Sequence, residues 1–404
     1  MTTMSDPPRE SFRLSQLIYD TRYRSLTIQV VATILLAVMI FWLINNTVQN
    51  LAALGKDFDF GFLGQRAGYD INQRLLEYSS ASTHGKAALI GILNTLLVAF
   101  LGCILATVLG VIAGVLRLSS NWVVARLMAV YVEGFRNVPL LLWIIAIFAV
   151  MTESTPSPRD FREGGSASMM LGDTLAVTNR GVYVPMPVWG PGSWVVVVVF
   201  LLSLVGIFAY RRLARKRQEA TGQILPVFRV SLALFFLPAI LAYFVMGGPV
   251  SLNYPELGGF NFDGGLHLRN SLIALWLALS LYTGAFIAEI VRGGILSVSK
   301  GQTEASFALG LRPNRTMNLV VLPQAMRVIV PPLISQYLNL TKNSSLAIAV
   351  GYMDARSTLG GITINQTGRE LEGMLLLGAF YLVLSLAISG VMNIYNASIK
   401  LKER

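Results

Sequence analysis

Long apolar segments alternate with short polar ones along this chain. Five segments hold no charged residue, and each is long enough to cross a hydrocarbon core of roughly 30 Å as a helix: 25–55, 87–116, 181–210, 230–255 and 373–399. Three more qualify less clearly: 137–152 is short, 270–288 is just long enough, and 328–353 is interrupted by Lys342. The pattern predicts an all-helical membrane protein with eight spans.

The spans are best drawn at 26–46, 88–116, 123–151, 194–210, 225–246, 271–291, 327–350 and 373–396. Two long segments, 47–86 and 152–193, separate them. The second is rich in Pro, Gly and Ser, which predicts an irregular loop. Within 88–116, the small residues Ala106, Gly110 and Gly114 recur every four positions, a pattern typical of a close helix-packing face.

Composition supports the membrane assignment, because 54% of the residues are hydrophobic and only 13% are charged. The net charge of +11 would also suit a nucleic-acid partner. With eight spans and a cytoplasmic N-terminus, however, cytoplasmic segments carry about twice as many Lys and Arg as outer ones. We therefore expect both termini in the cytoplasm and no nucleic-acid partner.

A basic cluster, RRLARKR at 211–217, follows one span directly. It could bind anionic lipid headgroups of the membrane. The interpretation that we favour is that the cluster only fixes the orientation of the preceding span in the membrane.

Residues for catalysis are missing from the sequence. It contains no phosphate-binding loop, no nucleophile elbow and no paired metal ligands. His84 and His267 are its only histidines and Cys103 is its only cysteine. We expect no enzyme activity, no metal and no cofactor in the chain itself.

Polar residues within the apolar spans are costly in lipid and are therefore candidate functional groups. Glu133 and Arg136 are three residues apart, so on a helix they could neutralise each other. Asn137 and Pro139 follow, and Pro139 should break the helix. A structural ion pair and a cavity lining explain this group equally well.

A second polar group begins at Lys342, well inside an apolar segment. Lys342 could extend outward to water or present a charge to a carboxylate substrate, and these readings are equally supported. Glu289 and Arg292 form another pair, for which a structural role at the membrane boundary is favoured. The residues beside Lys342 are neutral hydrogen-bonding side chains: Asn343, Ser344 and Ser345.

The stretch GQTEASFALGLRPN at 301–314 is predicted to lie in the cytoplasm. A short helix over 302–309 would place Glu304 in its first turn, where a carboxylate complements the helix dipole. Gly310 and Pro313 would end it. Its exposed apolar residues favour contact with a partner protein over packing on the chain's own surface.

These residues, EASFALGLRPNRTMNLVVLP, resemble the EAA loop of ABC-importer permeases. The flanking stretches AEIVRGGILSVSKGQTEA and LPQAMRVIVPPL, with YVEGFRNVPLL and LTKNSSLA, resemble the polar amino-acid subfamily. Within it, the likeness is greatest to the Q-type permeases of broad-range L-amino-acid importers. The motifs extend from about residue 88 to 396.

The resemblance implies a type I ABC-importer permease fold in a bacterial inner membrane. Its EAA loop would be a coupling helix that docks on a cytoplasmic ATPase dimer, and ATP and Mg²⁺ would bind to that partner. A periplasmic amino-acid-binding protein and a second permease subunit are the other implied partners. The residues that would position the coupling helix are Gln302, Glu304, Ala305, Gly310, Leu322 and Pro323.

The resemblance also implies a domain organisation. Residues 1–86 would hold the cytoplasmic N-terminus, the first span and an outer loop, and 87–396 the permease domain. A two-helix insertion at about 153–268, a coupling loop at 297–323 and a cytoplasmic tail at 397–404 complete the chain.

The chain departs from the family at Lys342, where many relatives have Lys-Asp-Thr-Ser. The missing carboxylate leaves a cation that would suit acidic amino acids. Two rival functions are a gradient-driven secondary carrier, using Glu133 and Lys342, and a membrane scaffold without transport.

Overall fold

The computed structural model describes residues 21–53, 55 and 58–399. The first 20 residues of the predicted cytoplasmic N-terminus and residues 400–404 of the predicted tail lie outside this range. By its contacts the chain divides into two units, Met1–Leu63 and Gly64–Arg404. In the first unit, α2 (Thr21–Ala53) is apolar and none of its membrane-crossing window is buried.

The larger unit holds the other helices. Seven helices of the described chain are long and apolar enough to cross a membrane, or eight if a bent pair counts as one span. The predicted all-helical membrane fold with about eight spans is thus confirmed. In the larger unit the long helices are α3 (His84–Leu116), α4 (Trp122–Asn137), α5 (Leu140–Glu153), α6 (Ser193–Thr221), α7 (Val227–Val245), α8 (Asn270–Leu296), α11 (Leu322–Asn343) and α14 (Glu370–Ile399).

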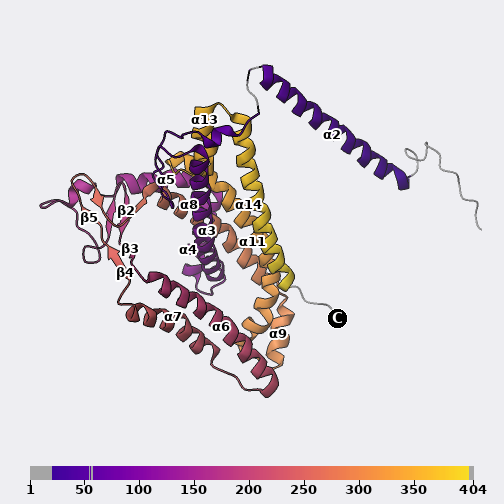
Figure 1. Ribbon diagram of the computed structural model, residues 1–404. Helices are drawn as coiled ribbons and strands as arrows, with labels where there is room; N and C mark the ends of the chain where they lie inside the picture. The colour runs from indigo at the N-terminus through magenta and orange to yellow at the C-terminus, as the bar shows by residue number, and fades with distance from the viewer. Residues whose placement is uncertain (1–20, 54, 56–57, 400–404) are drawn as a thin grey trace, which may run out of the picture. The chain divides into compact units, whose positions relative to one another are not determined.

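Helix α8 is the centre of this unit. It packs against α3, α4, α5 and α11, and 67% of its membrane-crossing window is buried. Figure 1 shows α3, α8, α11 and α14 as neighbouring helices, and α6 and α7 pack on each other as a pair. The main hydrophobic core lies between α3, α5, α8 and α11.

The contact between α3 and α8 depends on small residues. A Cβ atom at Gly110 would lie 2.5 Å from the Cβ of Ile287, and one at Gly114 would lie 2.6 Å from the carbonyl oxygen of Ala288. Ala106 is fully buried on the same face. The close packing predicted from the four-residue spacing is therefore present, and it allows the two backbones to approach.

The predicted span 123–151 is broken in the structure. Helices α4 and α5 meet at an angle of 108°. Val138 is extended, since a residue before proline avoids the helical conformation, and Pro139 is the N-cap of α5. Pro139 breaks the helix as predicted, but the two halves do not form one straight crossing.

The predicted irregular loop at 152–193 was wrong in part, because short strands organise it. β2 (Gly181–Val184) pairs with β1 (Ala176–Thr178) and with β7 (Leu266–Arg269), and β3 (Met186–Trp189) pairs with β4 (Val250–Asn253). The β2–β7 and β3–β4 pairs join the two stretches that flank α6 and α7. The remaining small elements here are η2 (Pro158–Phe161), β5 (Glu256–Leu257) and β6 (Phe262–Asp263).

Short helical pieces complete the larger unit. α9 (Lys300–Ala308), α10 (Pro313–Thr316) and the π-helical turn η3 (Met317–Val321) lead into α11. After α11, the chain continues as the 3₁₀ helix η4 (Ser344–Val350), α12 (Ala355–Ser357), the π-helical turn η5 (Thr358–Thr363) and α13 (Ile364–Thr367). The short 3₁₀ turn η1 (Gly61–Gly64) lies at the boundary of the two units.

Replacing Gly110 by Val should destabilise the α3–α8 contact, because the new side chain has no space beside Ile287. Overpacking of this kind costs about 1–3 kcal/mol. We expect a lower thermal unfolding midpoint for the purified protein in detergent. Gly134→Val on α4 is the matched control, since no atom lies within 4 Å of its Cβ position. Equal midpoints for the two variants would contradict the importance of this contact.

Candidate functional site

The coupling segment predicted from the sequence forms a short helix, α9. It begins at Lys300, two residues before the predicted start at Gln302. Glu304 is therefore the fifth residue, and the first turn contains no acidic side chain. The predicted interaction of Glu304 with the helix dipole was wrong, because that effect is confined to the first turn.

The end of α9 is as predicted. Gly310 has a φ of +75°, a conformation that favours glycine. Its N–H donates to the carbonyl oxygen of Phe307 over 2.9 Å, and the N–H of Leu311 donates to that of Ser306 over 3.1 Å. These two hydrogen bonds form the Schellman motif, which ends a helix and turns the chain sharply.

Helix α9 packs partly against the rest of the chain and is otherwise exposed. Ser306 is buried, and its hydroxyl donates to the carbonyl oxygen of Gln302 over 2.7 Å. The amide of Gln324 donates to the side chain of Gln302 over 3.4 Å. Phe307 and Leu309 remain 49% and 82% exposed. Exposed apolar side chains at the end of a fixed helix have the properties of a docking surface.

The other predicted coupling residues lie around this helix. Glu304 and Ala305 are exposed on α9 itself. Leu322 and Pro323 are exposed at the start of α11, directly after η3. The segment 300–323 thus collects the predicted residues on one connected surface element.

Near the α4–α5 break, the prediction that Glu133 and Arg136 form an ion pair was wrong. Arg136 lies over the ring of Phe286, 5.3 Å from its centroid. Glu133 accepts a hydrogen bond from the Asn137 amide over 3.4 Å and lies 3.9 Å from an Arg117 nitrogen. The two residues share a helix but turn to different partners.

Arg117 contacts two carboxylates, those of Glu133 and Glu289. Its side chain is only 13% exposed and donates to Glu289. Glu289 also accepts from Arg292 over 3.1 Å, so the predicted pair of Glu289 and Arg292 is present. The sequence reasoning missed Arg117, which is 172 positions from Glu289. The only feature of the sequence that pointed to Arg117 was its position directly after an apolar run.

Lys342 lies in the last turn of α11 and is exposed. Among the described residues no ion pair involves Lys342, and none joins it to Glu133. Asn343 ends α11, and the chain tightens into η4 at Ser344, whose hydroxyl donates to the carbonyl oxygen of Thr341 over 2.7 Å. Ser345 follows, half-buried. The structure therefore does not gather the predicted pathway residues into one pocket.

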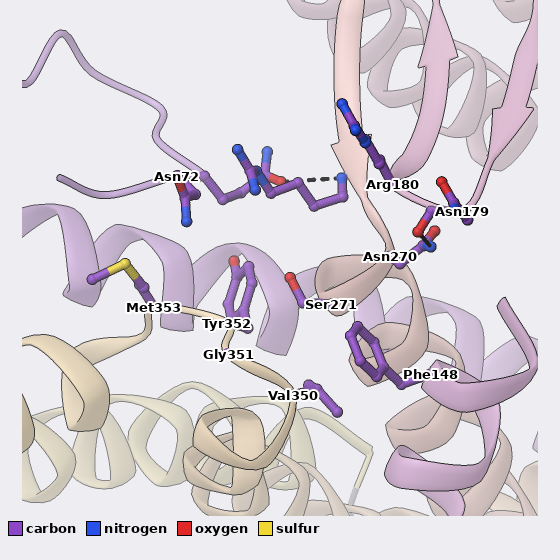
Figure 2. A pocket seen from close by; sticks show the side chains of 12 residues that line it. Asn72, Phe148, Asn179, Arg180, Asn270, Ser271, Val350, Gly351, Tyr352 and Met353 are labelled. Carbon is purple, nitrogen blue, oxygen red and sulfur yellow. Dashed lines mark hydrogen bonds between the residues drawn. The ribbon is translucent and has the colours of Figure 1, made fainter. Parts of the chain in front are cut away.

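A polar pocket that the sequence did not predict lies at the start of α8. Its volume is about 170 Å³. Figure 2 shows Asn179 and Arg180 at its side, above Ser271 and Tyr352. Its twelve lining residues are Asn72, Gln73, Phe148, Asn179, Arg180, Arg269, Asn270, Ser271, Val350, Gly351, Tyr352 and Met353.

His267 supports one wall of this pocket. Its ring stacks on Tyr183 at 4.2 Å, and its Nε2 lies 3.1 Å from the carbonyl oxygen of Arg180. Burial lowers the pKa of His267, which favours the neutral ring beside the arginines. No group of three His, Cys, Asp or Glu residues that could hold a metal ion occurs within the part of the chain that the structure describes.

Comparison with known proteins defines the class. Residues 106–401 match the model of the binding-protein-dependent transport system inner membrane component, and the chain belongs to this family. It is a permease subunit of an ABC importer, not itself an enzyme. The resemblance inferred from the EAA-like motif is thereby confirmed.

Several relatives match over nearly their full length. The BztB permease of a glutamate/glutamine/aspartate/asparagine transport system from Rhodobacter capsulatus is 54% identical and covers 100% of both chains. The general L-amino acid permease AapQ from Rhizobium johnstonii is 44% identical, covering 98% of this chain and 96% of its own. A solved amino acid ABC transporter with histidines aligns at 17% identity and a TM-score of 0.45, covering 78% of this chain and 95% of that one.

The Arg117 cluster makes a prediction about stability. Glu289→Gln should lower the free energy of unfolding by about 1–3 kcal/mol, because Gln removes the negative charge and leaves one oxygen to accept from two arginines. Glu133→Gln is the matched control, with an expected effect below about 1 kcal/mol, since its contact with Arg117 is long and exposed. Thermal and denaturant unfolding in detergent would measure both. A larger loss for Glu133→Gln would contradict this order.

Proposed function

We propose that this permease subunit imports polar and acidic L-amino acids, and that α9 transmits the action of a cytoplasmic ATPase dimer to the membrane helices. The exposed, glycine-terminated helix α9 is the observation that carries the coupling role. The substrate class is supported by the names of the two relatives that match along nearly the whole chain. Family membership favours this importer over the gradient-driven carrier and the scaffold.

The partners follow from the same class. A separate ATPase would bind ATP and Mg²⁺ and hold α9, and a periplasmic binding protein would deliver the amino acid. A second permease subunit would complete the pathway, as a heterodimer. Both termini would be cytoplasmic, because the basic residues are concentrated in the segments on that side.

The chain itself supplies a rigid mount for the coupling surface. Buried Ser306 and the bond between Gln324 and Gln302 hold α9 against η3 and α11. Phe307 and Leu309 then face away from the protein and can enter an apolar groove. Movement of the partner would reach α11 through this short connection.

For the substrate pathway we propose the residues predicted from the sequence: Glu133, Arg136, Asn137, Lys342, Asn343, Ser344 and Ser345. Exposure of Lys342 supports contact with another subunit or with substrate between subunits. Arg136, held over Phe286, would act as a fixed cation near the helix break.

Gly310→Val should uncouple ATP hydrolysis from uptake. A β-branched residue is strained at a positive φ, whereas Gly310→Asn should retain the helix end, because Asn tolerates this conformation. Nothing lies within 4 Å of the Cβ position, so a clash at Cβ affects neither variant. We expect at least about tenfold lower uptake per ATP in proteoliposomes for Val, corresponding to about 1.4 kcal/mol. Normal coupling in the Val variant would refute the role of α9.

Lys342→Met should reduce uptake of L-aspartate and L-glutamate more than that of L-asparagine and L-glutamine, by about tenfold or more. The reason is loss of a charge-assisted contact to the side-chain carboxylate. Lys342→Arg should retain most of the preference, and Lys86→Met is an exposed lysine control on another helix. Competition uptake assays would measure the ratio. An equal reduction for both substrate classes would assign Lys342 a structural role.

A further inference from the structure

The polar pocket at the start of α8 contains two arginines and no acidic residue. Arg269 ends β7, and Arg180 lies in the two-residue turn between β1 and β2. Neither makes an ion pair within residues 64–399, and the guanidinium of Arg180 donates to the carbonyl oxygen of Phe260, over 3.2 Å. The Nε of Arg269 is buried without a hydrogen-bond partner. The pocket therefore carries uncompensated positive charge.

The same pocket contains two unpaired acceptors. Asn270 is only 4% exposed, and its amide nitrogen donates to the carbonyl oxygens of Asn179, over 2.8 Å, and Met151, over 3.5 Å. Both partners accept, so they fix the amide orientation and leave Oδ1 as the free end. Oδ1 of Asn270 and Oδ1 of Asn179 are both buried without a partner. Buried polar atoms without partners are costly, and a bound ligand can satisfy them.

We propose that this pocket binds the zwitterionic α-amino-carboxylate group of an amino acid. The guanidinium groups of Arg269 and Arg180 would receive the carboxylate, because arginine presents paired donors that match its geometry. The free amide oxygens of Asn179 and Asn270 would accept from the ammonium. The proposal rests on the proposed amino-acid import function and adds a binding site that the predicted pathway residues do not include.

The dimensions and the construction of the pocket agree with this ligand. Its volume of about 170 Å³ leaves room for the main-chain end of one amino acid. Gly181 keeps the Asn179–Arg180 turn close to β7, since a Cβ there would lie 2.4 Å from the carbonyl oxygen of Leu268. Phe148 and Tyr352 form the wall beside Ser271 (Figure 2). By the predicted topology, the pocket opens on the side from which substrate arrives.

Equilibrium binding to the purified membrane complex, without binding protein, tests the site. The probes are radiolabelled L-glutamine, L-glutamate, L-asparagine and L-aspartate. At least one should bind, and Arg269→Gln should weaken its binding tenfold or more, while Arg269→Lys should weaken it less. Asn179→Ala should weaken binding severalfold, because it removes one free acceptor and leaves the backbone carbonyl that holds Asn270. Binding by none of the four, or unchanged binding in Arg269→Gln and Asn179→Ala, would overturn the proposal.

Analogues and controls separate the alternatives. L-glutamine amide lacks the α-carboxylate and glutaramate lacks the α-amino group, so each should bind at least tenfold more weakly than L-glutamine where L-glutamine binds. O-phosphoethanolamine carries phosphate and ammonium, and tighter binding of this probe than of the amino acids would reassign the pocket to a lipid headgroup. Arg162→Gln, an exposed arginine of the same outer segment, should bind like the wild type. Folding of each variant is checked by its thermal unfolding midpoint.

ATP-dependent uptake by the complete importer tests the underlying function separately. If the wild-type importer transports none of the four amino acids, the proposed function fails. If it transports them and the Arg269→Gln and Asn179→Ala complexes bind as well as the wild type, only the pocket assignment fails.

Discussion

The close contact between α3 and α8 is the constraint on which the rest of the larger unit depends. Lipid tails are as apolar as leucine, so helices in a membrane gain little from the hydrophobic effect and rely on tight packing. Gly110 and Gly114 provide it by letting the two backbones approach. Since α4, α5 and α11 also pack on α8, a displacement of α3 from α8 would disturb every helix around that centre.

The features that local chemistry determines were predictable from the sequence. Long apolar runs located the spans, Pro139 marked the break between α4 and α5, and Gly310 marked the end of α9. The four-residue spacing from Ala106 to Gly114 identified the packing face of α3. In each case the cause lies within one element or a few residues, so the printed sequence contains the whole argument.

The features that needed distant partners were not predictable. Arg117 pairs with Glu289 from another helix, and Glu133 and Arg136 contact Arg117 and Phe286 instead of each other. The strands β2 and β7 are separated by α6 and α7, and composition alone suggested an irregular loop. The pocket combines residues from five separate stretches of the chain, and no local pattern in the sequence brings Arg269 and Asn179 together.

The absence of any linker between β7 and α8 has a mechanical consequence. Arg269 is the last residue of the strand and Asn270 the first of the helix, while only three residues separate the other end of α8 from α9. A helix of 27 residues is about 40 Å long and stiff along its axis. The central helix α8 is thus a stiff rod that has the polar pocket at one end and helix α9 near the other. A force applied at either end is carried along its axis, with little flexible chain to absorb it.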